Sequence, residues 1–176
     1  MRKIHAYLIK TVYVACLTSI GSLAYGADGT IQFTGNITTD ACTVDATSAG
    51  TQTANLGTIA STAFTSSGDA AGSAPFQILL TACPATVTSV SVRFNGNTDA
   101  SDARLLALDS GATATAVGVG IYDDAGTIIP MQSDSKTYPV TTTGATLNFE
   151  GRYVSTGPTV GQGTANATTE FTIQYQ

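Results

Sequence analysis

The chain has few of the residues on which most enzymes depend. Its 176 residues include no tryptophan, one histidine and only seven lysines and arginines. The histidine, His5, lies in an N-terminal segment that we expect to be removed on export. General acid–base chemistry at neutral pH usually recruits histidine, so its absence from the rest of the chain argues against an enzyme.

Acidic residues do not fill this gap. Asp99 and Asp102 lie in a stretch of turn-forming residues and are interpreted as solvated loop acids rather than as a catalytic pair. The sequence contains no cluster of metal-ligating residues and no glycine loop of the kind that cradles phosphate. We therefore predict no catalytic residues, no metal site and no cofactor.

Long apolar runs are also missing, with one short exception near the N-terminus. Arg2, Lys3 and Lys10 precede an apolar stretch from Thr11 to Ile20, and small residues follow it. This order is typical of a secretory signal, while the stretch is shorter than the roughly 20 residues of a membrane-spanning helix. We predict a signal peptide at residues 1–26, although cleavage after Ala24 satisfies the small-residue rule as well as cleavage after Gly26.

Removal of this segment leaves four basic residues against twelve acidic ones, a formal charge of −8. A surface this acidic repels phosphate backbones, so the charge argues against nucleic acid as a partner.

Two of the three cysteines, Cys42 and Cys83, remain after export. Exported proteins enter compartments that oxidise thiols, so we predict that these two form one disulfide. Closing a loop of this length would stabilise the fold by roughly 4 kcal/mol in the loop-entropy description.

The remaining chain of about 150 residues predicts a single all-β domain. Short apolar runs recur between stretches rich in Gly, Asn, Asp and Ser, and no long stretch has a helical period. A hairpin turn is predicted at 123–126. The runs that we expect to contribute strands are Ala54–Ile59, Pro75–Ala82, Val87–Phe94, Leu105–Leu108, Val117–Tyr122, Thr127–Met131, Thr146–Val154 and Thr168–Tyr175.

The last strand ends at the chain terminus, with Phe171, Ile173 and Tyr175 on one face. A strand without a following hairpin leaves one backbone edge unpaired, and such edges pair with other chains. The segment 29–37 alternates in the same way at the other end of the exported chain. Alternation alone does not distinguish a tail for another molecule from an ordinary first strand.

Taken together, these residues resemble a known family, the chaperone–usher pilus subunits, and within it the major subunit of type 1 fimbriae. The resemblance covers the whole chain. It rests on the order and spacing of the signal peptide, the alternating segment 29–37, the pair Cys42 and Cys83, Arg152-Tyr153, Gly163 and Tyr175.

The resemblance implies an incomplete immunoglobulin-like sandwich whose missing strand comes from another subunit or from a chaperone. Residues 27–37 would form the donor extension, and 38–176 the pilin domain. The donor residues would be Gly29, Ile31, Phe33, Gly35 and Ile37. The acceptor and chaperone-binding residues would be Gly163, Phe171, Ile173 and Tyr175.

The expected partners are therefore a periplasmic chaperone, an outer-membrane usher and identical or related pilins joined head to tail. The expected function is that of a structural subunit of a fimbria on the cell surface, reached through the periplasm, that supports adhesion. The alternative is a self-complete secreted β-sandwich that binds a ligand or a host surface. Whether the subunit is a major or a minor one stays open.

Overall fold

A computed structural model describes residues 31–35 and 41–176 and separates the chain into two units, Met1–Ile37 and Thr38–Gln176. The second unit consists mainly of strands. They are β1 (Thr43–Val44), β2 (Ala70–Thr81), β3 (Ser89–Asn95), β4 (Val117–Asp123), β5 (Ile128–Ile129), β6 (Tyr138–Pro139), β7 (Gly144–Ser155) and β8 (Glu170–Tyr175). Two short helices, α1 (Ala46–Ala49) and the 3₁₀ helix η1 (Ser61–Ala63), accompany them.

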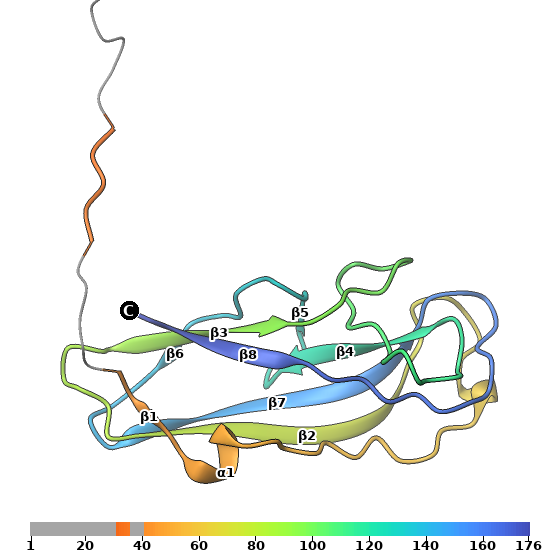
Figure 1. The fold of residues 1–176 in the computed structure, drawn as a ribbon, viewed down its shortest axis with the longest axis horizontal. Helices are drawn as coiled ribbons and strands as arrows, with labels where there is room; N and C mark the ends of the chain where they lie inside the picture. The colour runs from red at the N-terminus through yellow and green to blue at the C-terminus, as the bar shows by residue number, and fades with distance from the viewer. Residues whose placement is uncertain (1–30, 36–40) are drawn as a thin grey trace, which may run out of the picture. The chain divides into compact units, whose positions relative to one another are not determined.

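The strands form two antiparallel sheets that face each other (Figure 1). One sheet, here sheet A, has the order β1-β2-β7-β4-β5, and the other, sheet B, has the order β6-β3-β8. The long pair β2 and β7 runs from Ala70 opposite Val154 to Thr81 opposite Gly144 and forms the middle of sheet A. The predicted all-β sandwich is therefore confirmed.

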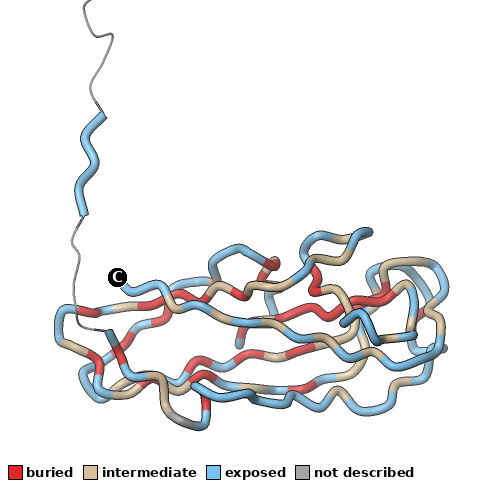
Figure 2. The backbone as a smooth tube through the Cα atoms, in the orientation of Figure 1, coloured by how far each residue is buried: buried red, intermediate tan, exposed pale blue. Residues whose placement is uncertain are grey.

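The core lies between the two sheets and takes buried residues from both. Figure 2 marks the buried residues along the strands. In β3, Val90, Val92 and Phe94 are fully buried, as the period of two predicts. The ring of Phe149 on β7 meets Phe94 edge-on at 5.2 Å between centroids and stacks on Phe76 of β2 at 5.5 Å. The contact of Phe94 with Phe149 joins sheet B to sheet A, whereas Phe76 and Phe149 are neighbours within sheet A.

The predicted disulfide is present and joins Cys42, just before β1, to Cys83, just after β2.

The predicted hairpin turn at 123–126 is present as well. The carboxylate of Asp123 accepts hydrogen bonds from the backbone N–H groups of Ala125 and Thr127, both within 2.9 Å. Gly126 has φ +75°, a conformation that glycine adopts without steric cost.

Two predicted strands are wrong. Residues 54–59 and 105–108 are in no strand of either sheet. The second run is short because it covers β4 on both sides: Leu106 joins the main core, while Leu105 packs beside Gly118, and both leucines are buried. Its pairing with β4 consists of two 2.9 Å hydrogen bonds exchanged by Leu106 and Val119, and it also bonds to residues 97–99 through Asp99 N–H to Leu105 and Ala107 N–H to Asn97.

Candidate functional site

The outer edge of β8 is open within the described domain. Sheet B places β3 between β6 and β8, so β8 has a paired neighbour on one side only. Ser89 and Gln176 exchange two backbone hydrogen bonds, which fixes the alternation along the β3–β8 ladder. It follows that the N–H and C=O groups of Phe171, Ile173 and Tyr175 point away from β3, toward the open edge.

The same three side chains form an apolar strip that is only partly covered. Phe171 and Ile173 pack against the core yet remain half-buried, and Tyr175 is 36% exposed. The Tyr175 hydroxyl donates to the carbonyl of Cys42 at 3.4 Å, which ties the end of β8 to the start of β1. An open backbone edge next to an uncovered apolar strip is what an additional strand requires.

The other side of β3, away from β8, is covered by residues 132–140. The N–H of Ser135 donates to the carbonyl of Val92 at 2.8 Å, and the Ser135 hydroxyl accepts from the Val92 N–H at 2.9 Å. The N–H of Gln132 bonds to the carbonyl of Phe94, and β6 pairs with the beginning of β3. β3 is thus paired on both sides, whereas β8 is paired on one side only.

Before the start of β8, the chain lines a pocket of about 590 Å³. One wall is residues 57–62 and the other is residues 160–166, with Phe64, Val117 and Tyr153 between them. The Tyr153 hydroxyl donates to the carbonyl of Ala165 at 2.9 Å and holds the second wall in place. The second wall is bonded to residues 113–115, because Thr115 and Gly161 exchange backbone hydrogen bonds of 3.0 and 3.3 Å.

Gly163, one of the predicted acceptor residues, belongs to this pocket wall. A Cβ at this position would lie 2.5 Å from the backbone nitrogen of Ala114, closer than real Cβ atoms approach. The close approach is held by paired backbone segments, since the N–H groups of Thr113 and Ala114 both donate to the carbonyl of Thr164 at 3.0 Å. Glycine is therefore required here for packing.

The predicted donor residues that the structure describes are almost fully exposed. The exposed fraction is 81% for Ile31 and 91% for Phe33, and no atom lies within 4 Å of a Cβ placed on Gly35. Gly29 and Ile37 lie outside the described residues. A large exposed isoleucine and phenylalanine in one short segment are unusual on a soluble protein and indicate a contact surface.

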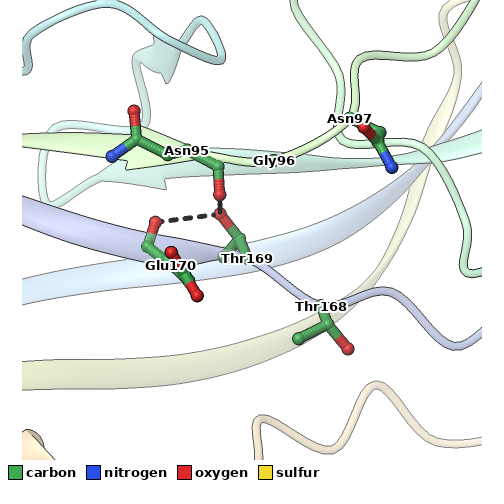
Figure 3. Close-up of a pocket in the computed structure, with 6 residues that line it drawn as sticks. All are labelled: Asn95, Gly96, Asn97, Thr168, Thr169 and Glu170. Atoms are coloured by element: carbon green, nitrogen blue, oxygen red, sulfur yellow. Dashed lines mark hydrogen bonds between the residues drawn. The ribbon is translucent and has the colours of Figure 1, made fainter.

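A second, shallower pocket lies where β3 ends and β8 begins (Figure 3). Figure 3 shows the Thr169 hydroxyl between the carbonyls of Asn95 and Glu170, to which it donates at 2.9 and 3.2 Å. The other side chains, from Asn97 and Thr168 among them, point apart rather than toward a common centre. These contacts hold the start of β8 to the end of β3 and offer no convergent binding groups.

The charged groups form local pairs on the surface. Arg152 holds the pKa of Glu150 at about 2 through a side-chain hydrogen bond, to which Ser73 adds. The carboxylate of Asp102 pairs with Arg104, which lowers its pKa, and Asp99 accepts the N–H of Ser101. Residues 31–35 and 41–176 contain no group of three or more histidines, cysteines or acidic residues that could hold a metal ion.

The same described residues contain no helix with the length and apolar character needed to cross a membrane.

The sequence did not predict the pocket before β8 or the covered side of β3. Phe64, Tyr153 and Val160 come from three separate stretches, and Ser135 acts through one hydroxyl. Periodicity describes neighbours in one strand, and no local signal links residues so far apart.

Comparisons with known proteins give one consistent result. A family model described as "Fimbrial protein" matches residues 31–176. Long polar fimbria protein A of Salmonella typhimurium is 37% identical over 97% of this chain and 99% of its own. The type-1 fimbrial protein subunit of Serratia marcescens is 36% identical over 91% of this chain and 93% of its own.

Solved structures give the same result. An antigen and type I fimbria protein of Burkholderia pseudomallei is 33% identical, covers 78% of this chain and 91% of its own, and has a TM-score of 0.61. The P pilus rod subunit PapA is 19% identical, covers 77% of this chain and 99% of its own, and has a TM-score of 0.65. The second likeness shows a shared fold.

Proposed function

Because the chain belongs to the fimbrial protein family, we propose that it is a structural subunit of an extracellular fimbria that polymerises by strand exchange. The observation that carries the mechanism is the open edge of β8 beside its partly covered apolar strip. The domain is an incomplete immunoglobulin-like sandwich, and a neighbouring subunit supplies the missing strand from its tail.

The donor strand is residues 29–37 of the neighbour. Burial of Ile31, Phe33 and Ile37 would contribute about 5 to 9 kcal/mol, at roughly 1.5 to 3 kcal/mol for each side chain. The open N–H and C=O groups of β8 add hydrogen bonds of about 0.5 to 1.5 kcal/mol each. Gly29 and Gly35 let the donor backbone approach the groove closely.

The acceptor site is Phe171, Ile173 and Tyr175, continued by the pocket that Gly163 lines. Donor and acceptor lie on different parts of one chain, so the contact between subunits is head to tail. Contacts of this kind build open filaments when the geometry does not close a ring.

Before assembly, the open edge needs a temporary partner, because a free strand edge aggregates. We propose that a periplasmic chaperone lends a strand to β8 and that an outer-membrane usher exchanges it for the tail of the next subunit. Complementation of pilins by a chaperone strand is an established example of strand addition. The chain then passes through the periplasm to the cell surface.

Two variants of the full-length chain test this proposal in cells that supply the chaperone and usher. Deletion of 171–176 removes both the backbone edge and the apolar strip, whereas Tyr175→Ser removes one aromatic contact and keeps the ladder. We expect the deletion to abolish co-purification with the chaperone and the single substitution to reduce it. If the deletion variant co-purifies with the chaperone at the wild-type yield, β8 is not the chaperone's partner.

The same cells, examined by electron microscopy, test the fimbria itself. Fibres are expected from the wild-type chain and from no cell that carries the deletion. A mature chain that stays monomeric and stable without chaperone would favour the alternative, a self-complete sandwich that binds a ligand or a host surface.

A further inference from the structure

We propose that the Cys42–Cys83 disulfide carries the tension of a stretched fimbria past residues 43–82 and delivers it to sheet B. The inference rests on the proposed function. In such a fibre each subunit is pulled at two places: where its own tail enters the domain, and along β8, which holds the tail of its neighbour.

The segment that follows the tail is weakly attached. The chain enters the domain at Cys42 and continues into β1, whose only register pairs with β2 are Thr43 with Thr81 and Val44 with Leu80. Beyond β1, α1 is held to β2 by a backbone bond from Asp45 and by the hydroxyl of Ser48. Without a cross-link, these few hydrogen bonds would meet the full load first.

The disulfide supplies a covalent path around this segment. The Cα atoms of Cys42 and Cys83 lie 4.1 Å apart although 41 positions separate them in sequence. Residues 84–88 alone connect Cys83 to β3, which pairs with β8 from Val90 opposite Tyr175 to Asn95 opposite Glu170. Figure 1 shows that β1, the beginning of β3 and the C-terminus lie at the same end of the sandwich.

The path therefore runs from the tail through the disulfide to β3 and across the ladder to β8. The bypassed segment includes residues 57–62, which form one wall of the pocket before β8. Because this wall bears no tension, pulling on a subunit does not dismantle the site that holds its neighbour. The disulfide thus keeps the acceptor site intact under load.

Stretching of single fibres, first as isolated and then in dithiothreitol, tests the load path. We expect reduction to add an early step at lower force, because residues 43–82 are now in the path. The added length per subunit would approach about 140 Å, at about 3.4 Å for each of the 41 positions. An unchanged force of first extension, with both thiols shown to be reactive, would overturn the proposal.

A pair of variants makes the same test, first in oxidised fibres and then after reduction. Val44→Ala on β1 and Val92→Ala on β3 delete the same two methyl groups; Val92 is fully buried in the main core, and Val44 is partly buried and packs against that core. In oxidised fibres we expect Val92→Ala to lower the unfolding force and Val44→Ala to leave it unchanged. After reduction, Val44→Ala should lower it too.

The outcomes separate this inference from the proposed function. Equal losses of force from both variants in oxidised fibres would overturn the load path while the fibres themselves stand. A wild-type chain that yields no fibres under the electron microscope would refute the proposed function, and the load path with it.

Discussion

The sharpest test of the donor assignment is Phe33→Asp, because Phe33 is the most exposed large apolar residue described, at 91%. Burying a phenylalanine side chain is worth roughly 3 kcal/mol at the upper end, which corresponds to about a 150-fold change in affinity. The aspartate adds a further penalty, since a carboxylate would enter an apolar groove without a partner. We therefore expect the affinity of the tail for the acceptor groove to fall by more than about 100-fold, and fibre assembly to fail with it.

The neighbouring residue supplies a matched control. Thr34→Asp introduces the same charge one position along, on the face that points away from the groove if the tail binds as a strand. Fibres are counted by electron microscopy, and chaperone capture is measured separately by co-purification. We expect Phe33→Asp to be captured but not polymerised, and Thr34→Asp to polymerise. Normal fibres from Phe33→Asp, or equal losses from both variants, would refute the assignment.

Three further predictions concern the domain itself. Gly163→Val should lower the free energy of unfolding by about 1 to 3 kcal/mol in a urea titration, because its Cβ meets the backbone of Ala114, whereas Gly111→Ala, with open space around it, should stay within about 0.5 kcal/mol. The Glu150 carboxylate contributes stability that is fully present above its unfolded pKa of 4.5 and is lost as the pH falls toward its folded pKa of about 2. Glu150→Gln should remove this contribution to the pH dependence of the free energy of unfolding. The contribution is no more than about 1 kcal/mol, because the Glu150–Arg152 pair is partly exposed. The same pH dependence between about pH 2 and 4.5 in the variant and the wild type would contradict this prediction. Peptide mapping without reductant should recover Cys42 and Cys83 as one cross-linked pair, and free thiols would contradict the structure.

Patterns within one strand were predictable from the sequence. Val90, Val92 and Phe94 point inward because a strand alternates its side chains, and the turn after Asp123 follows from the turn residues there. The disulfide followed from export and from the number of cysteines that remain. The apolar strip of β8 was predicted in the same way, since Phe171, Ile173 and Tyr175 alternate with polar residues.

Features that depend on distant parts of the chain were not predictable. The run 105–108 has strand composition, yet it meets β4 through the single antiparallel bridge of Leu106 with Val119, and its two leucines are buried in different places, Leu106 in the main core and Leu105 beside Gly118. The pocket before β8 combines Phe64, Tyr153 and Val160, which share no sequence period. Gly163 was predicted as an acceptor residue from the family resemblance, but its packing against Ala114 could be recognised only in the folded structure.

The sealing of β3 by residues 132–140 sets how many neighbours a subunit can have. Ser135 and Gln132 bond to the side of β3 that faces away from β8, so β3 has no open side, and the proposed tail would give each subunit one donor for the one open side of β8. A building block with a single donor and a single acceptor grows only in line, without branches. Exposed edges on both sides would instead let sheets extend sideways into aggregates. The hydroxyl of Ser135 thus helps to keep the polymer linear and unbranched.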